Sequence, residues 1–282
     1  MQTAPQDRDA PLTLGVDLGG TRLRLAAVDA HGAIRARAAA ATPLGGEPGA
    51  LTRVLREALA VLRPPGHLRG RAGVCLPGIR DAQGVLRRAV NLPRLEGVQV
   101  EQFFADALAM AVTVESDASA AAWAQWRASD PPAARFVYLT LGTGVGGGVV
   151  LDGRLVRHTN GGAGHFGFLI VDTTPAAPSR LTGLPGCLSE FASGAALESD
   201  DAHGLDRTAG ALAVAIQQLV SLYVPEIIAI GGGVAERRPE LVGLAAAALK
   251  HKPWPIVAPP RVVRAPLPGD DAGVIGAALL AV

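Results

Sequence analysis

The chain contains 282 residues, of which 49% are hydrophobic and 18% charged, and its formal net charge at pH 7 is +1. That length is sufficient for two modest domains with a sizeable core, and the hydrophobic fraction excludes wholesale disorder. The near-neutral charge argues against a nucleic-acid binder that works by overall charge, although a local basic patch stays open.

Targeting signals and cysteine usage favour a cytoplasmic protein. The apolar runs are short and broken by Gly, Pro and Arg, so none is expected to span a bilayer. The first residues, MQTAPQDRDAPLT, lack the basic-then-apolar pattern of a secretion signal. Cys75 and Cys187 form no CxxC pair, which excludes a Cys-rich zinc site and a disulfide framework. We therefore expect a cytoplasmic protein without a membrane partner.

The first part of the chain has the pattern of an antiparallel meander. Leu12–Val16 is an apolar run that leads into the turn Asp17–Thr21, and residues 22–27 then alternate between the two sides of a half-buried strand. A second turn at 29–32 allows 34–38 to return as a third strand. A hairpin, rather than a strand feeding a helix, is therefore expected after Asp17.

The rest of the chain alternates predicted helices and strands. The apolar spacing predicts helices over 51–62, 101–110, 118–126, 211–223 and 272–281, and strands over 73–76, 111–115, 136–141 and 226–230. A Gly-rich turn at 142–148 follows the strand over 136–141, and a further hairpin turn is marked by Asp152–Gly153. The repeat of strand, Gly turn and strand indicates a duplicated α/β domain, with a boundary near 116–135.

Residues 142–147 match the dinucleotide pattern GxGxxG, but in the wrong context. The Rossmann fingerprint opens a helix, whereas here a second strand and a Leu-Asp-Gly turn follow. No Lys lies near a Gly-rich loop, so a Walker A site is excluded as well. If these turns hold phosphate, they do so through backbone N–H groups, which glycine lets approach an anion closely. The alternative is a pair of plain tight hairpin turns.

Two aspartates stand at the ends of predicted buried strands. Asp17 precedes two glycines and can orient the water ligands of Mg²⁺ beside a triphosphate; the alternative is a turn residue that bonds its own backbone. Asp117 precedes a helix and can serve as a general base; the alternative is a plain helix N-cap, worth about 1 kcal/mol. Loop tips of this kind are favoured ligand sites.

Five segments resemble the ROK family of sugar kinases and repressors. They are Asp17–Arg22, Ser116–Ala121, Leu141–Gly148, Gly186–Glu190 and Gly231–Val234, in the family's order over almost the whole chain. The resemblance implies the α/β, actin-like (ribonuclease H-like) ATPase fold, with domains 1–117 and 118–282, an interdomain cleft, and the last helix, 272–281, packing back on the first domain. It also implies ATP and Mg²⁺, with transfer of the γ-phosphoryl group to a sugar hydroxyl.

The resemblance assigns roles position by position. Asp17 would serve Mg²⁺ and the phosphates, and Asp117 would be the catalytic base that takes the proton of the attacking hydroxyl, a role worth about 10²–10⁴-fold in rate. The expected phosphate and adenosine contacts are Gly19, Gly20, Thr21, Arg22 (where the family often has Lys), Gly142, Thr143, Gly144, Gly231, Gly232 and Gly233. The expected sugar contacts are Gly78, Ser116, Asp117, His165 and Glu190.

The departures from the family lie on the sugar side. Ser116 stands where the family usually has Asn. His165 and Phe168 stand where it has the Glu and the His of a Gly-Glu-x-Gly-His segment, whereas a third sugar-side carboxylate is kept as Glu190. A carboxylate accepts hydrogen bonds from two hydroxyls, but a neutral imidazole accepts one and donates one, so we expect a pocket of different polarity. The alternative for His165 is a structural histidine that bonds a protein partner.

Many family members also hold a structural zinc ion. The corresponding positions here are Phe168, Arg180, Thr182 and Cys187, of which only the cysteine is a zinc ligand. Because a closed structural site needs four ligands, we expect no zinc site. The segment 173–184 is then expected to pack as an irregular loop.

The leading hypothesis is an ATP-dependent, glucokinase-like sugar kinase that acts on a hexose or a modified hexose. A non-catalytic sensor of sugar or nucleotide is one alternative, motivated by the substitutions on the sugar side and opposed by the retention of Asp117 and Glu190. A sugar-responsive transcriptional regulator is less favoured, because only about a dozen residues precede the first strand, too few for a winged helix-turn-helix. We expect a small-molecule sugar as partner, no nucleic acid, and a homodimer.

Overall fold

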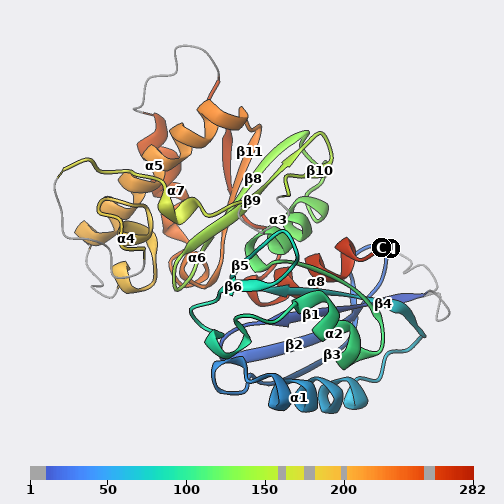
Figure 1. The fold of residues 1–282 in the computed structure, drawn as a ribbon. Helices are drawn as coiled ribbons and strands as arrows, with labels where there is room; N and C mark the ends of the chain where they lie inside the picture. Colours follow the sequence, from blue (N-terminus) through green and yellow to red (C-terminus); the bar gives the residue numbers. More distant parts are fainter. Residues whose placement is uncertain (1–10, 158–162, 175–181, 198–201, 251–257) are drawn as a thin grey trace. The chain divides into compact units, whose positions relative to one another are not determined.

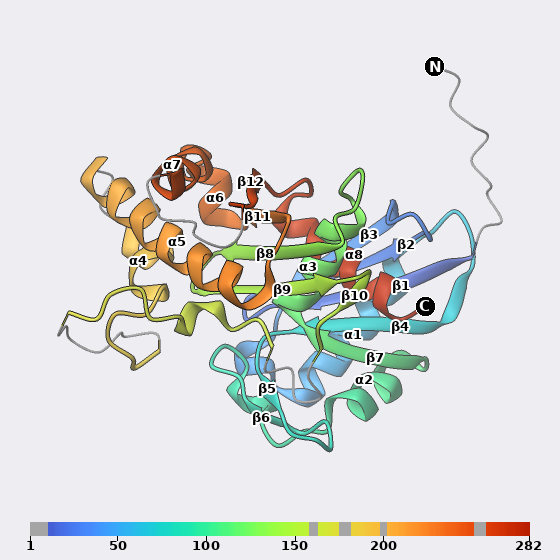
Figure 2. The same ribbon diagram turned by 90° about the horizontal axis from the view of Figure 1, so that it is seen from above.

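The computed structural model describes residues 11–157, 163–174, 182–197, 202–250 and 258–282 (Figures 1 and 2). The chain divides into two compact units. The first comprises the described parts of 1–124, 157–162 and 271–282, and the second those of 125–156 and 163–270. These units group residues by packing and do not test whether 1–117 folds alone, so the predicted domain boundary stays a prediction.

The first unit is built on a five-stranded mixed sheet in the order β3-β2-β1-β4-β7. β1 (Leu12–Leu18), β2 (Arg22–Val28) and β3 (Ile34–Ala41) are antiparallel neighbours, whereas β4 (Leu68–Leu76) and β7 (Ala111–Ser116) extend the sheet in parallel with β1. The predicted meander is confirmed. The predicted turn is too long, however, because β1 continues through Leu18 and leaves Asp17 inside the strand.

Helices cover both faces of this sheet (Figure 1). Side chains alternate across a strand, and those of Leu14 and Val16 join the main core with α1 (Pro48–Val61) and α2 (Val100–Leu108). On the opposite face lies α8 (Gly269–Leu280). A Cβ at Gly15 would lie 2.1 Å from a carbonyl oxygen of α8, and one at Gly73 would lie 1.8 Å from another. Glycine at these two positions therefore lets the helix backbone touch the sheet.

The second unit repeats this plan in the order β10-β9-β8-β11-β12. β8 (Arg135–Leu141), β9 (Val145–Leu151) and β10 (Arg154–Leu155) are antiparallel neighbours, and β11 (Ile227–Gly231) and β12 (Arg261–Arg264) run parallel to β8. Its core includes side chains of α4 (Ser189–Ala192), α5 (Ala202–Tyr223), α6 (Gly233–Arg237) and α7 (Glu240–Lys250). The predicted turn 142–148 is again too long, because Val145–Gly148 belong to β9.

The remaining elements are short or join larger ones. They are a hairpin of β5 (Ile79–Arg80) and β6 (Leu86–Arg88), the helix α3 (Asp117–Arg127), and 3₁₀ turns over Leu44–Gly46, Pro93–Leu95, Phe166–Phe168 and Ala195–Leu197. No helix in these described segments combines the length and the apolarity needed to cross a bilayer.

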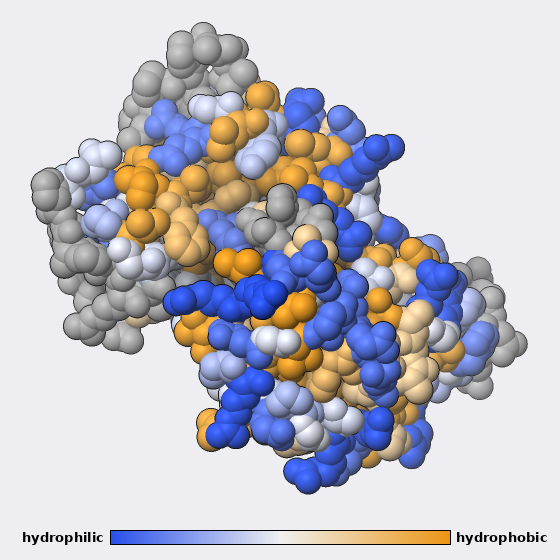
Figure 3. Space-filling model, in the orientation of Figure 1, coloured by the Kyte–Doolittle hydropathy of each residue, from blue (hydrophilic) through white to orange (hydrophobic). Residues whose placement is uncertain are grey.

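The surface carries mixed chemistry. On the face drawn in Figure 3, hydrophobic side chains are interspersed with hydrophilic ones. Large exposed hydrophobic residues include Leu44, Val61 and Val90. These side chains do not test self-association, so the homodimer stays a prediction.

Candidate active site

Three parallel strands of the first unit end at one edge of its sheet, and their last residues carry candidate catalytic groups. The register places Asp17 of β1 beside Cys75 of β4, and Cys75 beside Glu115 of β7. Asp117 follows at the start of α3. The carboxyl ends of parallel strands are where open α/β sheets bind ligands, so Asp17 and Asp117 both lie where a ligand site is expected.

Asp17 is a partly exposed carboxylate, with 15% of its side chain accessible. Arg24 Nη1 lies 3.3 Å from its Oδ2, and Cys75 Sγ donates to its Oδ1 over 3.5 Å. Burial and the neighbouring charge of Asp117 raise the pKa of Asp17 from 3.8 to about 6, against the opposing charge of Arg24. The influence of the Asp117 charge on this carboxyl indicates that the two side chains lie near each other at this edge of the sheet.

The loop between β1 and β2 is tightly closed. The N–H of Gly19 donates to the carbonyl of Arg22 over 2.9 Å, and the hydroxyl of Thr42 donates to the carbonyl of Gly19 over 2.7 Å. Gly20 must be glycine, because a Cβ there would lie 2.6 Å from Cβ of Asn91. These contacts hold the backbone of the predicted first phosphate loop in one conformation.

An open pocket of about 570 Å³ adjoins this loop. Its lining residues are Gly19, Thr21, Arg22, Arg24 and Ala39–Ala41. Two guanidinium groups beside a glycine turn suit phosphate oxygens, which arginine binds with charge-assisted hydrogen bonds.

Ser116 caps the helix that follows β7. Its Oγ accepts the N–H of Ser119 over 3.2 Å, which is the bond of an N-cap. Ser116 therefore supplies an N-cap bond at the start of α3. Asp117 is exposed and its Oδ1 accepts the N–H of Ala118 over 2.8 Å.

Gly78 lies just beyond the carboxyl end of β4, at the same edge of the sheet. Its φ of +133° is a conformation that other residues rarely adopt, and a Cβ would lie 2.7 Å from the carbonyl oxygen of Arg88. This glycine is therefore required by the backbone, and the part of the predicted sugar site that it forms is main chain.

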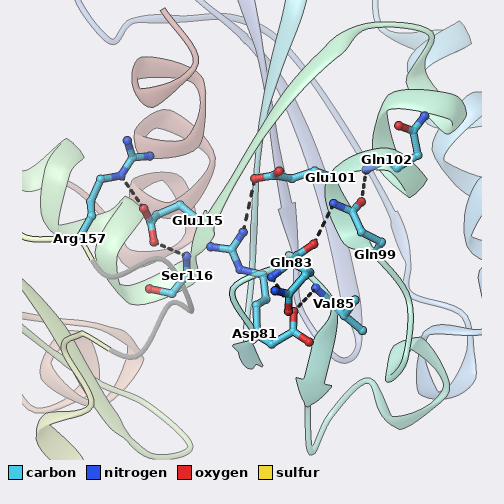
Figure 4. A network of polar contacts seen from close by, with 10 residues as sticks. Asp81, Gln83, Val85, Gln99, Glu101, Gln102, Glu115, Ser116 and Arg157 are labelled. Carbon is cyan, nitrogen blue, oxygen red and sulfur yellow. Dashed lines mark hydrogen bonds and ion pairs between the residues drawn. The ribbon is translucent and has the colours of Figure 1, made fainter.

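Sequence reasoning missed one pair at this edge, Glu115 and Arg157. Arg157 Nε donates to Oε2 of the buried Glu115 over 2.7 Å, and the N–H of Ser116 donates to Oε1 over 2.9 Å (Figure 4). The two residues lie 42 positions apart in the chain. A charged residue inside an apolar strand pattern was the only signal, and it does not name the partner.

In the second unit, two glycine loops lie at the carboxyl ends of β8 and β11, which are adjacent parallel strands. The N–H of Gly142 donates to the carbonyl of Gly144 over 2.9 Å. A Cβ at Gly142 would meet nothing within 4 Å, so this loop faces open space. Gly232 has a φ of +88° and packs against the end of β8, where a Cβ would lie 2.6 Å from the carbonyl oxygen of Leu141.

A pocket of about 420 Å³ adjoins the second of these loops. It is lined by Ile230, Gly231, Ala235, Glu236 and Arg264–Pro268. The loops 142–144 and 231–233 therefore share one edge, with a pocket beside Gly231.

The segment 164–168 carries His165 and Phe168, both exposed, with ring centroids 6.1 Å apart in an edge-to-face arrangement. A Cβ at Gly164 would lie 2.0 Å from the carbonyl oxygen of Gly147, so this segment packs directly on β9. The exposure of His165 argues against the alternative of a buried structural histidine.

Ser189, the first residue of α4, connects Glu190 to the same region. A Cβ at Gly167 would lie 2.3 Å from Ser189 Oγ, which also accepts the N–H of Val145 over 3.4 Å. Glu190 Oε2 accepts the N–H of Gly186 over 2.5 Å. The second unit therefore gathers His165, Glu190 and the start of β9 in one place.

The expected absence of zinc stays a prediction. Within the segments that the structure covers, no group of three His, Cys, Asp or Glu side chains is placed to hold a metal ion. Thr182 Oγ1 lies 2.9 Å from Cys187 Sγ. Arg180 and much of the predicted loop 173–184 lie outside the described residues.

Sequence comparison with known proteins identifies the family of this chain. The model of the ROK family matches residues 13–206. The chain is 34% identical to the N-acetylmannosamine kinase of Citrobacter koseri and 32% identical to that of Salmonella arizonae, in each case over 95% of this chain and 98% of the relative.

Solved structures that are similar in fold include sugar kinases of the same family. The ROK hexokinase of Thermus thermophilus superposes with a TM-score of 0.77 at 28% identity, over 96% of this chain and 97% of that one. A ROK family glucokinase of Streptomyces griseus, in complex with glucose and AMPPNP, gives 0.77 at 25% identity over 96% and 99%. The two five-stranded mixed sheets thus form the predicted actin-like ATPase fold. The chain therefore belongs to the ROK family and, within that family, to the sugar kinases.

Proposed function

We propose that the chain transfers the γ-phosphoryl group of ATP to a hydroxyl group of a hexose, with Asp117 as the general base. The observation that carries this proposal is an exposed aspartate at the carboxyl edge of three parallel strands, close enough to Asp17 to raise the pKa of that carboxyl. An exposed carboxylate at such an edge is accessible to a substrate hydroxyl, whereas a buried structural one is not.

The reaction needs one proton transfer from the sugar. As the hydroxyl oxygen attacks the γ-phosphorus, Asp117 accepts its proton, the bond from the γ-phosphorus to the bridging oxygen breaks, and ADP leaves with the electron pair. A base of this kind contributes about 10²–10⁴-fold in rate. The rest of the acceleration comes from positioning and from neutralising charge on the phosphate oxygens.

The residues present fit both ATP and Mg²⁺. Mg²⁺ in phosphoryl-transfer sites is held by one or two carboxylates together with substrate phosphates and water, and Asp17 supplies one such carboxylate at the sheet edge. When bound, the ion would neutralise charge on the phosphates. Gly142 faces open space that a Cβ would fill, which suits close approach of a phosphate to the loop 142–144.

The further contacts in this proposal follow the resemblance. Gly19, Gly20, Thr21 and Arg22 would contact phosphate beside the 570 Å³ pocket, and Gly231–Gly233 would approach the adenosine beside the 420 Å³ pocket. Gly78, Ser116, His165 and Glu190 would contact the sugar. The closed backbone of the first loop supports its role, because a preformed cradle binds an anion without ordering a mobile segment.

For the sugar we propose an N-acylated hexosamine, with N-acetylmannosamine as the first candidate. The support comes from the similar kinases that carry this name and from the exposed ring of Phe168 beside His165. An aromatic face offers an apolar wall to an acetyl methyl group.

The test is a coupled assay of ADP release with N-acetylmannosamine, N-acetylglucosamine, mannose and glucose. Asp117→Asn should lower kcat by about 10²–10⁴-fold with the KM for ATP unchanged, whereas Asp206→Asn, an exposed aspartate on α5, serves as the matched control. Unchanged turnover in Asp117→Asn would remove the proposed base. A preference for glucose over both N-acetylated sugars would refute the proposed sugar class while leaving the kinase reaction standing.

A further inference from the structure

One buried carboxylate at the sheet edge has no role in the reaction described above. The side chain of Glu115 is only 6% exposed. A buried charge is costly unless it is paired and hydrogen-bonded. Both oxygens of Glu115 are used: Oε2 accepts from Arg157 Nε over 2.7 Å, and Oε1 accepts the N–H of Ser116 over 2.9 Å (Figure 4).

These bonds form a continuous connection to the proposed base. The bond from Ser116 N–H to Glu115 holds the last peptide group of β7, between Glu115 and Ser116, one residue before α3 begins. Ser116 Oγ in turn caps α3 through the N–H of Ser119 over 3.2 Å. Asp117 is the next residue, so the direction of its side chain depends on how this junction is held.

Arg157 comes from a different part of the chain. It follows the hairpin of β9 and β10, and its side chain is 43% exposed. Because so much of the Arg157 side chain is exposed, it contributes little to the hydrophobic core beneath the sheet. What it supplies at this edge is a cation for the buried carboxylate.

We propose that Arg157 is a positioning residue for Asp117, acting through Glu115 and Ser116; this inference rests on the proposed function. The guanidinium keeps the Glu115 carboxylate turned inward, where it can accept the Ser116 N–H. Without the cation, the unpaired carboxylate gains free energy by turning toward water. The junction then loosens and Asp117 departs from its working position. A misplacement of about 1 Å at a reacting group can lower the rate by about 10²-fold.

A purely structural ion pair makes a different prediction. In that case the loss of Arg157 lowers the melting temperature, but every molecule that remains folded turns over at the normal rate. A positioning role lowers kcat in fully folded protein. The separation of kcat from stability and from the KM for ATP therefore decides between the two.

The experiment compares Arg157→Met, Arg157→Lys and the double variant Glu115→Gln/Arg157→Met, with Arg154→Lys on β10 as the matched control. The kinetics are measured well below the melting temperature, with folding checked by circular dichroism. For Arg157→Met we expect kcat to fall by about 10-fold or more with the KM for ATP within about twofold, and a smaller fall for Arg157→Lys. The double variant removes the unpaired charge yet keeps an acceptor for Ser116 N–H, so it should recover part of kcat, and it remains informative if Arg157→Met fails to fold.

Wild-type kcat in folded Arg157→Met, or no recovery in the double variant, would overturn the proposal. A wild-type protein that turns over none of the sugars would instead refute the proposed function. In that event amide hydrogen exchange tests the positioning role. The backbone amide hydrogens of Ser116–Ser119 should exchange faster in Arg157→Met than in wild type. Equal exchange rates would exclude a positioning role for Arg157.

Discussion

Asp17 and Arg24 face each other across β1 and β2, with Arg24 Nη1 3.3 Å from Asp17 Oδ2. The guanidinium of Arg24 thus lies beside the carboxylate that we propose as a ligand of Mg²⁺. Its charge lowers the pKa of Asp17, but burial and the charge of Asp117 outweigh it and bring that pKa to about 6. The carboxylate is ionised at neutral pH, and its protonation falls in a range that kinetics can reach.

The first prediction concerns the pH dependence of turnover. Because kcat/KM reports groups of the free enzyme, kcat/KM for ATP should decline as the pH falls through about 6, where Asp17 becomes protonated. Arg24→Met removes a charge that lowers this pKa, so the acid limb should move to higher pH. Arg37→Met, which replaces an exposed arginine of β3, should leave the limb in place. Identical profiles for Arg24→Met and wild type would contradict this assignment.

The second prediction links the same residue to stability. A folded-state pKa raised from 3.8 to about 6 means that the folded chain binds this proton more tightly than the unfolded chain does. Stability is therefore lost as the pH rises from 3.8 to about 6, and the full penalty, at most about 3 kcal/mol, applies above that range.

Asp17→Asn removes this penalty together with the proposed metal ligand. The variant should be inactive, yet more stable than wild type in urea at pH 7.5 and not more stable at pH 3.5 to 4. Residues that serve function at the expense of stability behave in this way. A variant that is destabilised at pH 7.5, or stabilised equally at both pH values, would show that burial of the charge is not the cause.

The third prediction separates a functional loop from a structural turn. A Cβ added at Gly142 would have no neighbour within 4 Å, so Gly142→Ala should leave the melting temperature almost unchanged. If the loop cradles phosphate, the added Cβ occupies the space of the ligand, and we expect the KM for ATP to rise by about 10-fold, equivalent to about 1.4 kcal/mol. Gly210→Ala on α5, where a Cβ also meets nothing within 4 Å, is the control. Unchanged ATP kinetics in Gly142→Ala would favour the plain hairpin turn.

Local patterns were enough to predict most of the sheets. The alternation along 22–27 and the turns on either side predict a meander, and β1, β2 and β3 form one. The limits of the turns were less accurate. Leu18 is fully buried and pairs with Leu23, so the ladder continues past the apolar run that ends at Val16. The end of a strand depends on its hydrogen bonding to the neighbouring strand, and the apolar pattern of one strand alone does not show that pairing.

Two kinds of feature escaped prediction from the sequence. The helix α7 is rich in alanine, and its small side chains give little contrast between a buried and an exposed face. The ion pair of Glu115 and Arg157 joins residues 42 positions apart, and no local pattern names such a partner. The candidate residues Asp17 and Asp117 were found because each follows a predicted apolar run, which is a local signal.

The last prediction concerns the packing of α8 against α3. At Gly276 a Cβ would lie 1.7 Å from the carbonyl oxygen of Ala120, a backbone atom that cannot turn aside. Gly276→Ala should therefore destabilise the chain by about 3 kcal/mol, at the upper end of the cost of overpacking. Gly243 is exposed on α7, and a Cβ added there would meet nothing within 4 Å. Gly243→Ala should therefore stabilise the folded chain by up to about 1 kcal/mol through helix propensity. Urea denaturation of both variants measures the difference, and a Gly276→Ala protein as stable as wild type would mean that α8 does not pack with its backbone against Ala120.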